Sequence, residues 1–151
     1  MKKLSVVVAV SLLVTLISCS LAYASTEAEA KSMVEKAIAY YKANGKEKAF
    51  QEINNTKGQF VKGDLYVFVY DMSGKCVSHG FNEKLIGKDL VEMKDPDGKL
   101  YVKERLEIAK SKGKGWQDYK FTNPTNKKIE RKTAYIEKAD DFVFGCGTYK
   151  Q

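Results

Sequence analysis

A run of six apolar and aromatic residues, 65–70, lies between polar segments and predicts a strand that is buried on both faces at the middle of a sheet. Residues 71–74 have the composition of a turn, with Asp at the first position and Gly at the last. Residues 76–79 predict a returning strand that ends at His79, the only histidine of the chain. We therefore expect this hairpin to form the floor of a ligand pocket.

Three segments show the spacing of apolar residues that is typical of amphipathic helices. The first follows a capping box made by Thr26 and Glu29, and an Asn-Gly pair should end it at residue 44. A shorter helix is expected over residues 46–54 and a third over 101–112, where two glycines follow. Both N-terminal helices are expected to pack on the sheet.

Three further strands are expected over residues 116–122, 129–139 and 142–150, because turn-forming residues separate them. The segment 81–90 has no sustained period, and one short helical turn is expected around 90–93. The order of elements is therefore two helices, two strands, a helical crossover and three strands. This order predicts one α+β domain with an antiparallel sheet and helices segregated to its faces.

The N-terminus, residues 1–24, has the three parts of a secretory signal peptide: two lysines, an apolar run, and the sequence Ala-Tyr-Ala ending at Ala24. Cleavage there would leave a mature domain of residues 25–151 that is periplasmic or secreted. A competing interpretation is a lipoprotein, because Leu-Ile-Ser before Cys19 resembles a lipobox. We favour cleavage after Ala24, which removes Cys19; membrane contact is expected only under the competing interpretation, in which Cys19 is lipidated.

The charge pattern argues against an anionic partner surface. The chain carries a net charge of +7, and removing Lys2 and Lys3 with the signal peptide leaves +5. The remaining lysines alternate with acidic residues and form no basic block, which is typical of a solvated surface. An exported protein does not meet nucleic acid in the cytoplasm, so we expect no nucleic acid partner.

The reactive side chains are few. Cys76 and Cys146 could pair in an oxidising compartment, but two small buried hydrophobes are at least as consistent with the pattern, and we expect no bridge. The segment 95–98 predicts a turn and lacks the further oxygen ligands of a calcium loop. With one histidine and no paired carboxylates, we expect no metal, no cofactor and no enzymatic activity.

Several short motifs occur in the order and spacing found in single Cache domains, over nearly the whole mature chain. They are residues 66–71, Gly74, His79, residues 85–90, Asp97-Gly98, residues 113–119, Asn123-Pro124, Lys132, Tyr135 and residues 145–149. The chain is therefore similar to this family of extracytoplasmic sensors of small solutes, often carboxylates. The resemblance implies a PAS-like antiparallel sheet of about five strands, with the N-terminal helices on one face and the helical crossover on the other.

The resemblance also implies a set of ligand-binding positions. These are Phe68, His79, Met93, Trp116, Tyr119 and Lys132. The strand pattern alone would leave Lys132 exposed, whereas the resemblance directs it to the ligand and Arg131 to the opposite face. The spacing of Trp116 and Tyr119 puts them on opposite faces unless a bulge lies between them.

The resemblance implies an exported stand-alone domain that binds a small carboxylate for sensing or signal transduction. The chain ends at Gln151 after the last expected strand, so signalling would use a separate membrane sensor kinase, chemoreceptor or transporter. The alternative is an envelope protein–protein interaction module without a small-molecule ligand. For His79 two roles stay open, a hydrogen-bonded strand histidine or an imidazolium that holds the anion, whose affinity would fall as pH rises.

Overall fold

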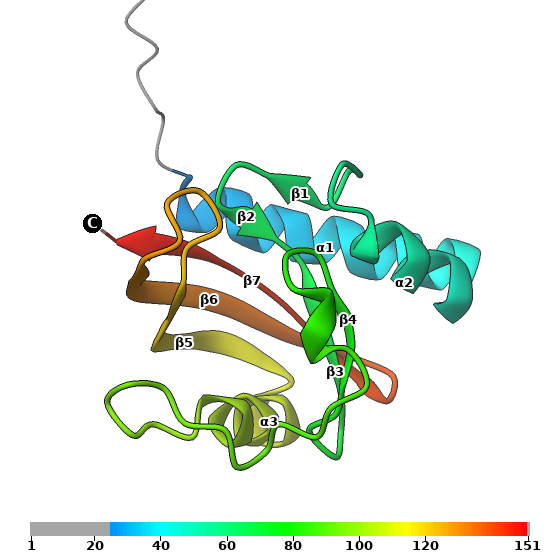
Figure 1. The fold of residues 1–151 in the computed structure, drawn as a ribbon. Helices are drawn as coiled ribbons and strands as arrows, with labels where there is room; N and C mark the ends of the chain where they lie inside the picture. The colour runs from blue at the N-terminus through cyan, green and yellow to red at the C-terminus, as the bar shows by residue number, and fades with distance from the viewer. Residues whose placement is uncertain (1–24, 151) are drawn as a thin grey trace, which may run out of the picture.

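The structure is a computed structural model that describes residues 25–150 (Figure 1). The proposed signal peptide and Cys19 lie outside the described residues. Within 25–150, none of the helices has both the length and the apolar character that crossing a membrane requires.

The helices lie where the sequence predicts them. Helix α1, Glu27–Asn44, begins at the expected capping box: the Thr26 side chain accepts a hydrogen bond from the Glu29 backbone (3.1 Å), and the Glu29 carboxylate accepts one from the Thr26 backbone (2.9 Å). Gly45, with φ of 82°, separates it from α2, Lys46–Asn54. Helix α3 is Tyr101–Lys112.

The strands form two antiparallel sheets. A small sheet pairs β1 with β2, and the main sheet has the order β4-β3-β7-β6-β5. The strands are β1 Val61–Lys62, β2 Leu65–Tyr66, β3 Phe68–Asp71, β4 Cys76–His79, β5 Lys114–Thr122, β6 Ile129–Ala139 and β7 Phe142–Lys150. Because β4 and β5 are the two edges, the segment that contains α3 crosses the whole sheet (Figure 1).

The structure differs from the prediction in several places. Strand β5 begins at Lys114 rather than at residue 116, and a single hydrogen-bonded turn, Met93 N–H to the Leu90 carbonyl (2.9 Å), replaces the helical turn expected around 90–93. The two larger differences are in the central strand and in the segment after it. The expected strand 65–70 is divided at Val67, whose N–H donates to the carbonyl of Phe60 and whose carbonyl accepts from Gly80, both outside the named strands. All six side chains are nevertheless buried, as predicted. The second difference is a 3-10 helix, η1 (Glu83–Leu85), in a segment without an apolar period, where the side chain of Asn82 caps the backbone of Lys84.

The sheet separates two hydrophobic cores. Helices α1 and α2 cover one face and α3 covers the other (Figure 1), as the sequence predicts. Cys76 belongs to the core under α3, whereas Cys146 belongs to the core under α1, where its thiol contacts the Met33 sulfur. The two cysteines are both free, and their position on opposite faces explains why no bridge joins them.

Candidate functional site

The register of the sheet brings Lys132 to the centre of the face under α3. Lys132 of β6 lies opposite Tyr119 of β5 and Tyr149 of β7, and neighbours in register point to the same side of a sheet. Two rows further along the same face, Phe68 of β3 lies opposite Gly145 of β7. The alternation Gly145, Gly147, Tyr149 therefore puts two residues without side chains and one phenol on this face.

The Lys132 side chain is fully buried among aromatic rings. Its Nζ lies 3.8 Å from the ring centre of Tyr66, 4.8 Å from that of Tyr149, 5.4 Å from that of Phe68 and 5.8 Å from that of Phe121. It donates one hydrogen bond, to the Tyr149 hydroxyl at 3.3 Å. Burial lowers the pKa of Lys132 to about 7, because water no longer stabilises the ammonium.

A chain of hydroxyl groups fixes the position of Tyr149. Its O–H donates to the carbonyl of Thr122 (2.7 Å), since a carbonyl oxygen can only accept. The Tyr149 oxygen then accepts from the Tyr66 hydroxyl (2.9 Å) and from Lys132. Burial raises the pKa of both tyrosines, so both stay protonated.

His79 is buried and lies among the rings that surround Lys132. Its ring centre is 5.1 Å from that of Tyr66, 6.2 Å from that of Phe68 and 6.3 Å from that of Phe121. Nδ1 accepts hydrogen bonds from the backbone N–H groups of residues 81 and 82 (3.2 and 3.0 Å), so the neutral ring carries its hydrogen on Nε2. It can therefore donate that hydrogen to an anion.

The surroundings of His79 argue against the imidazolium hypothesis. Burial, with the positive charges of Lys132 and Arg105, lowers the pKa of His79 to about 3. The ring is thus neutral at physiological pH. A loss of affinity as pH rises through an ordinary histidine pKa is therefore not expected from His79.

This buried histidine leads to a prediction about acid stability. In the unfolded chain His79 takes up a proton near pH 6.5, but in the folded protein only near pH 3, so stability falls as pH falls through this window. One proton corresponds to about 1.4 kcal/mol per pH unit. Urea unfolding between about pH 6 and pH 4 should therefore show a steeper loss for the wild type than for His79→Asn; equal slopes would contradict the buried neutral ring.

Arg105 is a second buried cation, and the sequence analysis missed it. It lies on α3, is 1% exposed, and its Cζ is 4.2 Å from the ring centre of Phe68 and 4.7 Å from that of Tyr70. The rings of Tyr101 and Tyr119 lie within 5.5 Å. One sequence signal could have revealed it: Arg105 is the one charged residue of the buried stripe of α3, between Val102 and Ala109 in that stripe.

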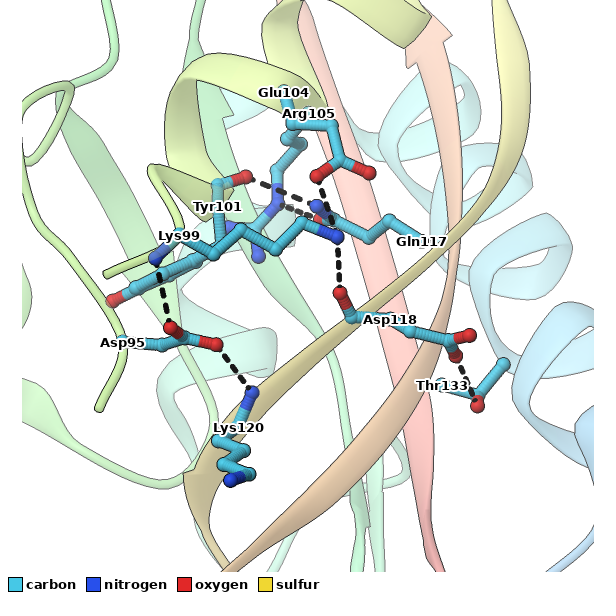
Figure 2. Close-up of polar contacts among 9 residues, drawn as sticks. All are labelled: Asp95, Lys99, Tyr101, Glu104, Arg105, Gln117, Asp118, Lys120 and Thr133. Atoms are coloured by element: carbon cyan, nitrogen blue, oxygen red, sulfur yellow. Dashed lines mark hydrogen bonds and ion pairs between the residues drawn. The ribbon is translucent and has the colours of Figure 1, made fainter. Parts of the chain in front are cut away.

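Gln117 of β5 holds Arg105 in place. Figure 2 shows the Nε of Arg105 donating to the side-chain oxygen of Gln117 (2.9 Å), while the amide nitrogen of Gln117 donates to the carbonyl of Tyr101 (3.0 Å). The glutamine is itself buried and thus connects the first turn of α3 to the strand. The hydroxyl groups of Tyr70 and Tyr119 also lie within hydrogen-bonding reach of the guanidinium, so Arg105 is held in a fixed orientation.

The turn at 95–98 attaches the segment before α3 to the edge strand. The Asp95 carboxylate accepts hydrogen bonds from the backbone N–H groups of Asp97, Lys99 and Lys120 (2.9, 2.9 and 3.0 Å), the last two drawn in Figure 2. Burial alone would raise the pKa of Asp95, but these donors lower it below its usual value. The side chain of Lys99 adds contacts to the Asp118 carbonyl and to Glu104. The segment is a turn, as predicted.

Neither buried cation is neutralised by the protein. The ion pairs within residues 25–150 all use other side chains, so none of them pairs Lys132 or Arg105 with a carboxylate. A buried charge without a partner costs several kcal/mol. The two cations and the N–H and O–H donors of His79 and the tyrosines therefore make a site whose chemical complement is a small anion.

Of the six sequence-predicted site residues, four lie in this cluster: Phe68, His79, Tyr119 and Lys132. The ring of Phe68 contacts both cations, Arg105 and Lys132. Tyr119 stacks on Tyr101 with ring centres 4.8 Å apart and contacts Arg105. Arg131 is exposed, as its alternation with Lys132 predicts.

The structure places Trp116 outside the cluster. The pairing of β5 with β6 is continuous from Lys114 to Thr122, so no bulge turns Trp116 toward the side of Tyr119. Trp116 is 41% exposed and packs on the Tyr135 ring of the opposite face (5.2 Å between centres). Trp116 and Tyr119 therefore lie on opposite faces of the sheet, as their spacing in a strand without a bulge predicts.

Met93 lies at the rim rather than beside the cations. It lines a surface hollow of about 360 Å³ together with Tyr101, Phe121 and Ile129. Its sulfur accepts a hydrogen bond from the Tyr101 hydroxyl (3.1 Å). Because Tyr101 also contacts Arg105 and Phe121 contacts Lys132, this hollow lies one layer of rings outside the buried cations.

The acidic and sulfur side chains do not gather into a metal site. Among residues 25–150, no three histidines, cysteines or carboxylates come together in a way that could hold an ion. The polar groups of the buried cluster are donors and cations, which repel a metal ion. The arrangement thus fits an anion and not a cation.

Comparison with protein families gives a match over nearly the whole chain. The model of the family described as Single Cache domain 2 matches residues 3–150. Two curated relatives are similar over 88 residues, 57% of the chain: the methyl-accepting chemotaxis protein McpP of Pseudomonas putida, 31% identical, and the sensor histidine kinase MctS of Rhizobium johnstonii, 32% identical. The matched part is only 16% and 19% of their respective lengths.

Solved structures share the fold. A methyl-accepting chemotaxis protein of Vibrio parahaemolyticus superposes with a TM-score of 0.71 at 23% identity, covering 81% of this chain and 86% of that one. A periplasmic sensor domain of a chemotaxis protein gives 0.65 at 25% identity, covering 82% and 90%. A Cache chemosensory domain described for carboxylic acid recognition gives 0.64 at 26%, covering 82% and 88%.

Proposed function

Because this chain belongs to the single Cache domain 2 family, we propose that it binds a small carboxylate in the buried site under α3 and serves in sensing or signal transduction. The observation that carries the proposal is the pair of buried cations, Lys132 and Arg105, without an acidic partner among residues 25–150. The relatives are a chemoreceptor and a sensor kinase, and one structural neighbour recognises carboxylic acids.

The site offers distinct groups to the two oxygens of a carboxylate. Arg105 is fixed at Nε by Gln117, and its planar guanidinium is the group that can make a two-pronged contact with a planar anion. Lys132 supplies a second positive charge, and the Nε2 hydrogen of His79 a neutral donor. The rings of Phe68 and Tyr119 give the ligand an apolar contact and keep the site dry.

We place the protein in the periplasm or outside the cell, delivered by a signal peptide over residues 1–24. Cache domains are extracytoplasmic sensor domains, and one neighbour is a periplasmic sensor domain. A lipid anchor at Cys19 is the alternative. The partner in signalling would be a membrane sensor kinase, chemoreceptor or transporter.

The proposal predicts a specific response to ligand. Purified protein is heated with a panel of short carboxylates, with amino acids and neutral solutes as comparison; a ligand present at a hundred times its dissociation constant stabilises by about 2.7 kcal/mol. A rise in Tm confined to carboxylates supports the proposal. An unchanged Tm with every compound would instead favour an envelope protein–protein interaction module.

Lys132→Ala should weaken binding of the best carboxylate by about 1.5 to 3 kcal/mol, the usual value of a charge-assisted hydrogen bond. Lys138→Ala is the matched control, because Lys138 is an exposed lysine of the same strand. Calorimetric titration measures both. Equal affinities for the wild type and Lys132→Ala would remove this lysine from the site.

A further inference from the structure

We propose that the site takes up one proton with each carboxylate, so that the protein captures the equivalent of a carboxylic acid rather than the anion alone. This inference rests on the proposed carboxylate-binding function and concerns the charge of Lys132 before and after the ligand arrives. The proton comes from solvent. It joins the Lys132 amine, and the bound state then contains an ammonium beside a carboxylate.

The geometry around Lys132 suits an amine better than an ammonium. An ammonium has three N–H donors, but Nζ has a single hydrogen-bond acceptor among residues 25–150, the Tyr149 oxygen at 3.3 Å. That oxygen also accepts from Tyr66. The remaining neighbours of Nζ are ring faces, which accept hydrogen bonds weakly.

The helix and strands packed against Lys132 direct only neutral or positively charged groups toward it at neutral pH. Helix α3 supplies the Arg105 cation, β4 the neutral His79, and β2 and β7 the protonated Tyr66 and Tyr149. Strand β5 supplies Phe121 and the Thr122 carbonyl, and β3 supplies Phe68.

Two further groups act on the ammonium from a distance. Asp64, before β2, favours it through its negative charge. The Cys146 thiol would favour it only as a thiolate, but burial raises the pKa of Cys146 to about 12. The thiol is thus uncharged near neutrality and gives no such help.

Two opposing effects decide the charge of the empty site. The faces of Tyr66 and Tyr149 attract a cation. Against this stand complete burial, which removes hydration, and repulsion by Arg105. Desolvation of a fully buried charge is the larger effect, so Lys132 has a pKa of about 7 and a large fraction of the empty protein holds a neutral amine at slightly alkaline pH.

A bound carboxylate reverses this balance. It supplies acceptors for the unused N–H groups and a negative charge at contact distance, both of which raise the pKa of Lys132. Arg105 stays charged throughout and attracts the anion before the lysine is protonated. The net charge of the site, the single positive charge of Arg105, is then the same before and after binding.

The expected signature is an affinity that depends on pH on the alkaline side. Below about pH 7 the lysine of the empty site is already protonated, so affinity is constant. Above that value each pH unit lowers affinity by up to about tenfold, until the pKa of the bound complex is reached. A site with a permanently charged lysine would show no such loss.

The first test needs no ligand. Protein labelled with 13C-lysine is titrated by NMR, and we expect one lysine signal to shift near neutral pH, to be lost in Lys132→Met and to persist in Lys138→Met. If the Lys132 signal shows no titration below about pH 9, where ordinary lysines are still charged, the inference is overturned whatever the protein binds.

The second test counts protons with propionate as the probe. Calorimetry at pH 8 in buffers of different ionisation enthalpy should give an uptake approaching one proton per propionate, and an uptake near zero at pH 6. Propionate that binds at pH 8 without proton uptake overturns this inference and leaves the proposed function intact. If neither propionate nor any other carboxylate binds, the proposed function fails, and the NMR titration still decides the state of Lys132.

Discussion

Arg105→Met is expected to weaken carboxylate binding by more than about a hundredfold while leaving the protein at least as stable as the wild type. The loss corresponds to about 3 kcal/mol, because two charge-assisted hydrogen bonds to one anion are removed together. Stability is preserved for a different reason: the variant removes a buried charge that has no acidic partner in residues 25–150. Calorimetric titration and urea unfolding measure the two effects separately.

Lys103→Met is the matched control for this variant. Lys103 is an exposed cation on the same helix, so its loss changes the net charge by the same amount without touching the site. We expect it to bind like the wild type. An Arg105→Met protein that keeps full affinity, or that fails to fold, would show that Arg105 is a structural cation rather than a ligand contact.

Gly145→Ala is expected to destabilise the fold by about 3 kcal/mol, near the upper end for overpacking a core. A Cβ at this position would lie 2.2 Å from the Phe68 ring and 2.9 Å from Ile136, far inside normal contact distance. The Phe68 ring would have to move, and it contacts both buried cations. Thermal or urea unfolding should therefore show lower stability, and titration should show weaker binding.

A double-mutant cycle identifies the cause. In a Phe68→Leu background the ring is absent, so adding Ala at position 145 should cost much less than it does in the wild type. An unchanged cost in that background would mean that the clash with Phe68 is not the source of the destabilisation.

The sequence by itself determined where the helices begin and end, and which residues of each strand share a face of the sheet. The capping box at Thr26, the Asn-Gly pair after α1 and the glycines after α3 are local signals, and each helix ends where these residues predict. The alternation of residues of β6 and β7 between the two cores likewise follows from the two-residue period of a strand. Four of the six predicted site residues lie in one cluster. They could be predicted because the motifs that contain them resemble those of a family over the whole domain.

Only the tertiary structure decided which charges are buried and what surrounds them. Arg105 is one arginine in a helix with three lysines, and only the packing of α3 on the sheet places it over Phe68 and beside Gln117. The neutral state of His79 depends on its burial, on cations from other elements and on two backbone donors to Nδ1. Such long-range effects on burial and charge depend on which distant segments meet, so no local pattern in the chain contains them.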